Sequence, residues 1–352
     1  MRKSLKANKW LWIISALLAI VVVGFLIVPG DDHDFEVDGI YYEIVDDISY
    51  SVKVVKHEYS GAVVIPKDLT YRGRNYTVTE IGAYAFNGCS KMTSISIPES
   101  VWHVGIGAFN ACSGLKEIHI SDLSAWCELS FFDVADDAGD SPLNYADELY
   151  LNGELITDLV VPSDVREIGA HSFEGYKNLR SVVFHKGISA IHKSAFLNCA
   201  NLIEVSFAGD VEYIGPYTFD GTPWCENKLD GEVYIGKLLY KYKGEMPSNT
   251  SFVVKEGTEY ICQSAFDCCE ELTSITLPSS LKQIHDYAFN GCDNLKEVYC
   301  KSLTPPSINS SYNNFHNDAV IYVPNGTREA YREASSLFEN VVEVDFTNIN
   351  LR

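Results

Sequence analysis

I-G-A-Y-A-F-N-G-C, residues 81–89, is the stretch of sequence that decides the fold, because near-copies of it return along the chain. Neighbouring copies start 23 residues apart, and a fixed period of this size is typical of stacked coils. The further copies lie at 104–112, 168–176, 191–199, 261–269 and 284–292, with a partial copy at 214–221. The repeat therefore predicts a solenoid, whose extended faces commonly serve as binding surfaces.

Each copy holds the same pattern of apolar positions. One slot is always phenylalanine: Phe86, Phe109, Phe173, Phe196, Phe219, Phe266 and Phe289. Nine and eleven residues later come apolar residues that alternate with others, which predicts a half-buried strand. The A-F-x-x-C part is too short for a full helix and fits one turn of α-helix or 3₁₀-helix. We therefore expect a β-rich α/β solenoid of parallel strands and short helical turns, with the phenylalanines in a column behind the sheet.

The spacing of the phenylalanines breaks twice, with 64 residues from Phe109 to Phe173 and 47 from Phe219 to Phe266. Leu159 in the first gap and Phe252 in the second match strand slots, so we expect degenerate coils at 121–160 and 222–260. The solenoid then covers 81–303. Because open ends would expose apolar faces and strand edges, 35–80 and 304–352 are expected to be its N-terminal and C-terminal caps.

Residues 10–28 are almost wholly apolar and, as a helix, would match the hydrocarbon thickness of a bilayer. Basic residues precede them and acidic ones follow, so the positive-inside rule predicts a cytoplasmic basic tail at 1–9, a transmembrane signal anchor at 10–28 and a linker at 29–34. The repeat domain would be membrane-anchored and extracytoplasmic, in the periplasm or at the cell surface. A signal peptide cleaved near Gly30 would also export the domain. A buried core helix is the third alternative.

The repeat resembles the BspA-type leucine-rich repeat family, whose coils read roughly I-G-x-x-A-F-x-x-C-x-x-L-x-x-I-x-I-P. The copies at 81–98 and 261–278 follow that pattern closely, and the similarity covers about 35 to 345. The resemblance implies a leucine-rich repeat solenoid, surface exposure and, in some members, adhesion to host matrix proteins. It carries over no catalytic residue, because the family pattern consists of core and turn positions.

Ten cysteines raise the question of disulfides. Five of them share one repeat slot, which in another copy holds Tyr176, so we expect packing positions filled by buried thiols. Adjacent strands lie about 4.8 Å apart, within disulfide range, so Cys89 with Cys112 and Cys269 with Cys292 remain alternatives.

The sequence contains no H-E-x-x-H, G-x-S-x-G, phosphate-loop or EF-hand motif, so no catalytic residue, cofactor or metal ion is predicted. The net charge of −21 argues against binding to nucleic acid.

The open face of the predicted sheet is the candidate ligand-binding surface. Its outward slots flank the ninth residue after each phenylalanine. The side chains in these slots are small and mixed in character, with no aromatic stripe or charge ladder. They are Ser94, Ser96, Glu117, His119, Ser181, Val183, Glu204, Ser206, Ser274, Thr276, Glu297 and Tyr299.

We therefore expect a non-enzymatic repeat protein that binds protein or glycan ligands, with adhesion to host matrix or other cells as one role. One alternative is a structural envelope scaffold that packs against a membrane partner. Another is a hydrolase with its site in the irregular loops at 121–160 or 222–245. Within the second loop, Y-K-Y-K at 240–243 is either an exposed aromatic and basic patch or an alternating strand with two tyrosines packed inward.

Overall fold

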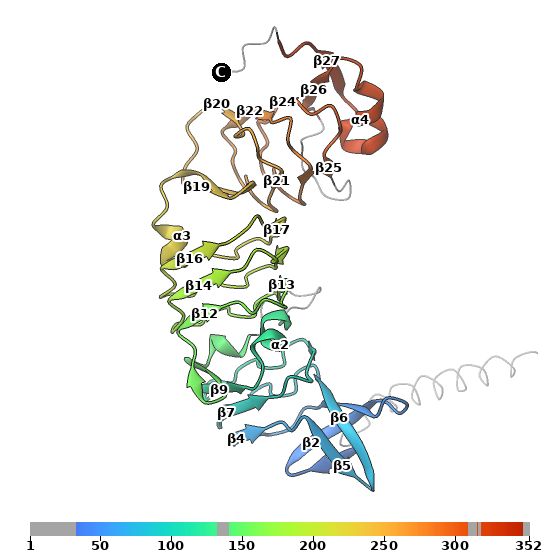
Figure 1. The fold of residues 1–352 in the computed structure, drawn as a ribbon, viewed down its shortest axis with the longest axis vertical. Coiled ribbons are helices and arrows are strands. Elements are labelled where there is room, and N and C mark those ends of the chain that lie inside the picture. Colours follow the sequence, from blue (N-terminus) through green and yellow to red (C-terminus); the bar gives the residue numbers. More distant parts are fainter. Residues whose placement is uncertain (1–32, 132–140, 309–314, 316–317, 348–352) are drawn as a thin grey trace, which may run out of the picture.

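The structure is a computed structural model that describes residues 33–131, 141–308, 315 and 318–347. The described chain forms an elongated solenoid whose coils stack along the long axis of the molecule (Figure 1). Its N-terminal strands lie at one end, and α4 (Arg328–Ala334) and β27 (Val341–Val344) lie at the other. The predicted leucine-rich repeat solenoid is confirmed.

Most coils contribute one strand to a sheet that we call the long-strand sheet, which has three segments. The first has the order β11-β10-β9-β7-β4: β11 (Glu154–Leu155), β10 (Glu148–Leu151), β9 (Glu117–Ile120), β7 (Met92–Ile97), β4 (Gly61–Val64). The second comprises β12 (Asp158–Val160), β14 (Ser181–Phe184) and β16 (Glu204–Phe207). The third comprises β20 (Thr250–Val253), β22 (Leu272–Leu277), β24 (Glu297–Cys300), β26 (Val320–Pro324) and β27. All pairs are parallel except β10 with β11.

A second sheet, the short-strand sheet, runs along the I-G part of each repeat. Its middle segment comprises β13 (Glu167–Ile168), β15 (Ala190–Ile191) and β17 (Tyr213–Ile214). Its last segment comprises β18 (Gly231–Ile235), β19 (Leu238–Lys243), β21 (Tyr260–Ile261), β23 (Gln283–Ile284) and β25 (Ser307–Ile308). The first segment joins the N-terminal strands: β1 (Phe35–Val37), β2 (Ile40–Asp46), β3 (Ser51–Val54), β5 (Asp68–Tyr71), β6 (Arg74–Ile81) and β8 (His103–Val104).

The A-F-x-x-C corner corrects one expectation, because it is not a turn of helix. In the first coil Tyr84 and Gly88 have positive φ angles of 57° and 79°, the geometry of successive type II turns. The N–H groups of Tyr84, Phe86 and Gly88 donate to carbonyls of the next coil, each at 2.8 Å. The same three bonds recur between later coils, and we call this third hydrogen-bonded column the turn ladder. A helix would use these N–H groups internally, whereas the alternating turn leaves them free to join coils.

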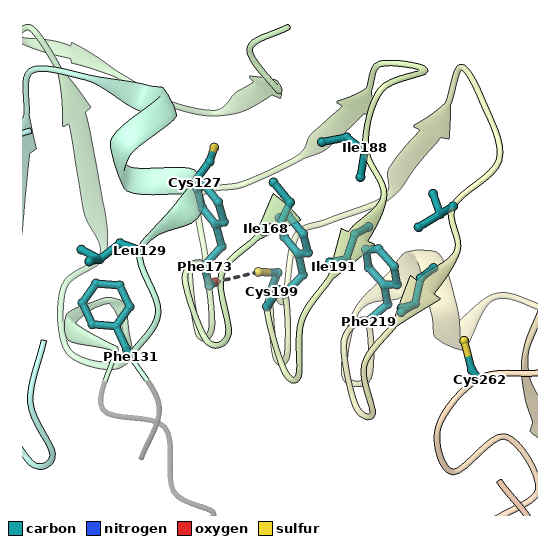
Figure 2. Packing of buried hydrophobic residues seen from close by; sticks show 14 of the residues in the cluster. Cys127, Leu129, Phe131, Ile168, Phe173, Ile188, Ile191, Cys199, Phe219 and Cys262 are labelled. Atoms are coloured by element: carbon teal, nitrogen blue, oxygen red, sulfur yellow. Dashed lines mark hydrogen bonds between the residues drawn. The ribbon is translucent and has the colours of Figure 1, made fainter. Parts of the chain in front are cut away.

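The phenylalanines form the predicted column, and all seven are buried. Phe196 stacks between Phe173 at 5.2 Å and Phe219 at 5.5 Å between ring centroids. Figure 2 shows this part of the core, with Ile168 and Ile191 beside the rings. Since the Phe196 ring contacts the rings of both neighbouring coils, the stability of its coil depends on its nearest neighbours.

Irregular segments fill the two breaks in the column. In the first, Asp122 precedes α2 (Leu123–Glu128) and caps it, because its carboxylate accepts a hydrogen bond from the Ala125 N–H. The helix buries Trp126. Phe131 then contacts Phe109 at 6.4 Å, and η1 (Pro142–Asn144) follows. In the second, α3 (Pro223–Glu226) precedes the hairpin of β18 and β19.

The hairpin decides between the two interpretations of residues 240–243, because they form part of an alternating strand. Tyr240 is buried against Phe219, and Tyr242 contacts Phe266. Two tyrosines therefore bridge the column where one phenylalanine is missing.

Short helical elements cover the last coils of the solenoid. At the C-terminal end α4 and η2 (Ser336–Phe338) pack Tyr331 and Phe338 onto the last coils, with Tyr331 donating to the Ser302 carbonyl at 2.8 Å. Among the described residues no helix has the length and apolar character needed to cross a bilayer. The predicted anchor at 10–28, the tail at 1–9 and most of the linker lie outside the described residues.

All ten cysteines are free, and all except Cys268 are buried. The buried thiols of Cys112, Cys199 and Cys292 each donate to the carbonyl of the phenylalanine in the preceding coil, at 3.1 Å, and Figure 2 shows this bond for Cys199. The slot therefore favours a small apolar side chain with a weak donor, and the expectation of buried thiols rather than disulfides is confirmed for nine of the ten.

Thiol labelling checks this arrangement. Burial raises the pKa of Cys112 to about 12 and that of Cys269 to about 11, so neither forms the reactive thiolate at neutral pH. We expect one thiol, that of Cys268, to react in the native protein and ten to react after unfolding without reductant. Cys268→Ser should abolish the native signal. Fewer than ten thiols in denaturant would contradict the structure.

Candidate binding surface

The structure brings the predicted sheet-face residues together in two rows on the outward face of the long-strand sheet. Ser94 lies opposite Glu117 and Ser96 opposite His119. The other predicted residues pair in the same way: Ser181 with Glu204, Val183 with Ser206, Ser274 with Glu297 and Thr276 with Tyr299. The eighth residue after each phenylalanine thus enters one row and the tenth enters the other.

Strands from the degenerate coils and the two ends extend both rows with residues that the sequence prediction missed. The polar row is Ala62, Ser94, Glu117, Glu148, Asp158, Ser181, Glu204, Ser251, Ser274, Glu297 and Val320. The apolar row is Val64, Ser96, His119, Tyr150, Val160, Val183, Ser206, Val253, Thr276, Tyr299, Tyr322 and Val342. The sequence did contain a signal for the residues next to Leu159 and Phe252. These two residues were assigned to inward strand slots, and the residues beside an inward residue of a strand face outward.

The polar row contains five carboxylates and no lysine or arginine within the described strands: Glu117, Glu148, Asp158, Glu204 and Glu297. Hydrogen bonds from the hydroxyls of Ser181 and Thr157 lower the pKa of Asp158. Lys116, Arg180 and Lys296 lie beside this row, each directly before its strand. The row is therefore anionic at neutral pH.

Hydrogen bonds connect the two rows. The Tyr150 hydroxyl donates to Glu148 at 3.0 Å, and the Tyr299 hydroxyl donates to Glu297 at 3.1 Å. Burial, followed by the bond to Glu297, raises the pKa of Tyr299 to about 12, so this phenol stays protonated. The hydroxyls of Tyr150 and Tyr299 are thus satisfied within the face, which leaves the carbon edges of these two rings for a ligand.

The apolar row exposes valines in all three segments of the sheet. The exposed fractions are 63% for Val64, 66% for Val160, 42% for Val183, 46% for Val253 and 40% for Val342. Aromatic pairs lie in the same row: His119 stacks on Tyr150 at 5.1 Å and Tyr299 on Tyr322 at 4.6 Å, both with rings inclined by 11°. This corrects the expectation of a small and mixed face without an aromatic stripe.

Thr276 departs from its predicted exposure, since only 5% of it is accessible to solvent. It lies in the apolar row between Val253 and the ring of Tyr299, its neighbours across the two strand pairs. A threonine between two side chains on a sheet face is covered by them, so Thr276 supports the row but is not itself accessible to a ligand.

The residues of the described ranges contain no group of three or more histidine, cysteine, aspartate or glutamate side chains placed to hold a metal ion. The loop at 222–245 borders a groove of about 600 Å³, and no histidine lines it.

Comparison with known proteins supports the family assignment. The model of the BspA type leucine rich repeat region matches in six copies, at residues 69–134, 146–242 and 234–351. Among solved structures, a leucine-rich repeat protein from Bacteroides ovatus is 21% identical to this chain. The match covers 89% of this chain and 82% of the Bacteroides protein, with a TM-score of 0.33. A leucine rich cell surface protein from Faecalibacterium prausnitzii is 18% identical, with 88% and 99% covered and a TM-score of 0.35. The curated proteins include no match to this chain.

Proposed function

Because the chain belongs to the BspA-type leucine-rich repeat family, we propose that it is a non-enzymatic binding protein whose ligand contacts the polar and apolar rows of the long-strand sheet. The apolar row carries this proposal. Its five exposed valines occupy one slot in strands from all three segments. Aligned apolar side chains on one face are typical of interaction surfaces, because a ligand that covers them removes apolar area from water.

The stacked rings favour a protein ligand over a glycan. A sugar ring stacks against an open aromatic face, but Tyr299 and Tyr322 use their facing sides on each other. Their outer sides point along the sheet toward Thr276 and Val342, the next residues of the row. The rings therefore offer edges, which pack well against the side chains of a protein.

The polar row indicates the charge of that protein. Five carboxylates with no lysine or arginine among them favour a partner surface on which basic groups lie beside apolar ones. Opposite charges across an interface speed encounter and fix register. Binding should weaken as salt rises. Adhesion to host matrix proteins is the role that we propose for this interaction.

Val160→Thr with Val183→Thr tests the binding face. The two valines are neighbours across β12 and β14, and threonine keeps their shape and strand preference while adding a hydroxyl. We expect at least tenfold weaker binding to immobilised matrix extract, with the free energy of unfolding within about 0.5 kcal/mol of the wild type. Ile203→Thr is the matched control, because Ile203 is exposed outside both rows. Unchanged binding of the double variant, or an equal loss in the control, would refute the proposal.

Proteins of this family are typically found at the cell surface or outside the cell. We propose that residues 10–28 anchor this chain in the membrane and that the repeat domain lies outside, because a long apolar run follows a basic tail. Protease treatment of intact cells should release fragments of 35–352 and leave the N-terminal segment with the membrane. If the domain resists until the cells are lysed, surface display is wrong.

A further inference from the structure

A groove of about 600 Å³ opens where the turn ladder is interrupted between the coil of Phe219 and the coil of Phe266. Figure 1 shows α3 and β19 at this level, between β16 and β17 on one side and β20 to β22 on the other. Tyr217 and Asp220 line the groove from one turn, Ser264 and Asp267 line it from the other, and the end of β19 lines it as well. The groove is distinct from the sheet face, since none of its lining residues belongs to either row.

The interruption leaves ladder groups that bond to no other described residue. Its centre is bridged, because the Phe219 N–H donates to the Tyr240 hydroxyl at 3.1 Å and the Tyr242 N–H donates to the Ala265 carbonyl at 2.7 Å. The turns of Phe86, Phe173, Phe196 and Phe266 each make three such bonds to the next coil. The hydrogen bonds of the described residues use neither the outer donors, Tyr217 N–H and Gly221 N–H, nor the opposing acceptors, the Gln263 and Asp267 carbonyls.

The groove is also acidic, and its two lysines are already engaged. Asp220, Glu226, Asp230 and Asp267 line it together with Lys241 and Lys243. Lys241 bonds both carboxylate oxygens of Asp220, at 2.8 and 2.9 Å. Lys243 donates to the carbonyls of Glu226 and Lys228, each at 2.8 Å.

That leaves two of the four acidic side chains uncompensated. Within the described residues, the carboxylates of Glu226 and Asp267 form no ion pair with a lysine or arginine. A ligand with positive charge therefore complements the groove.

We propose that this groove binds an extended peptide segment of a partner protein that carries lysine or arginine and completes the turn ladder. Five residues, the span from Tyr217 to Gly221, match the missing turn. The peptide carbonyls would accept from the Tyr217 and Gly221 N–H groups, and its N–H groups would donate to the Gln263 and Asp267 carbonyls. Main-chain bonds supply affinity in this mode, as in strand addition to a sheet edge, and the carboxylates select the side chains.

An array of random hexapeptides probed with the full chain tests the charge preference. We expect enrichment of peptides with lysine or arginine, and at least tenfold weaker binding of the strongest peptide to Asp267→Lys. Asn87→Lys is the matched control, because Asn87 holds the same turn slot in the first coil. No basic enrichment, or equal binding by Asp267→Lys, would overturn the proposal.

Two further measurements separate ladder completion from simple charge attraction and from the sheet face. Methylating alternate amide nitrogens of the strongest peptide removes its N–H groups, so its affinity should fall at least tenfold; unchanged affinity would exclude the ladder. Val160→Thr with Val183→Thr should bind the peptide like the wild type. Loss of peptide binding in that double variant would place the site on the sheet face and overturn the groove assignment.

Discussion

Phe196→Ala is expected to lower the free energy of unfolding by about 3–5 kcal/mol, because it removes a buried ring and leaves a cavity. No part of Phe196 is accessible to solvent. Its ring lies nearly parallel to those of Phe173 and Phe219, inclined by 3° and 7°, and meets the edge of Phe184 at 5.9 Å. Contact with both neighbouring coils means that one substitution weakens two interfaces at once. Urea unfolding followed by circular dichroism measures the loss.

Val183→Ala is the matched control for this prediction, because Val183 lies exposed on the outward face, one strand away. It should change the free energy of unfolding by less than about 1 kcal/mol. If Phe196→Ala costs no more than Val183→Ala, the phenylalanine column does not hold the coils together, and their stability has another source.

Gly169→Ala should cost about 3 kcal/mol, the upper end for overpacking, because the added methyl group meets backbone rather than a flexible side chain. A Cβ at Gly169 would lie 2.2 Å from the Leu129 carbonyl oxygen, directly after α2. Relief requires α2 to move. That movement would break the bond from the Gly169 N–H to the Cys127 carbonyl, 2.7 Å, and the bond from the Phe131 N–H to the Ala170 carbonyl, 2.9 Å.

Gly88→Ala separates the effect of crowding from that of backbone conformation. Gly88 has a φ of +79° and no atom within 4 Å of a built Cβ, so alanine there meets only the strain of the left-handed conformation, about 1 kcal/mol. Thermal unfolding of both variants should show the larger drop in midpoint for Gly169→Ala. Equal drops would mean that contact with the end of α2 does not constrain this position.

The glycine slot illustrates how far sequence reasoning reaches. Other coils hold His192, Cys262 and His285 at the slot of Gly169, which already indicated that positive φ is not required there. The structure agrees, since neither these residues nor Gly169 has positive φ. One slot that does adopt it lies two places before each phenylalanine, as at Tyr84 and Ser194, and it is mostly not glycine, so composition gave no sign of that slot.

The repeat alone determined the solenoid, the parallel strands, the buried phenylalanine column and the packing role of the cysteine slot. It could do so because each coil buries the same slots, and the pattern is local and repeated seven times.

Tertiary structure decided the turn geometry, the apolar row and the groove between the coils of Phe219 and Phe266. Val160, Val183 and Val253 are ordinary residues until parallel register aligns strands separated by irregular insertions. The donors and acceptors of the groove exist only because a hairpin replaces one turn of the ladder. Which groups remain for a ligand depends on contacts between coils, and a pattern within one coil does not contain that information.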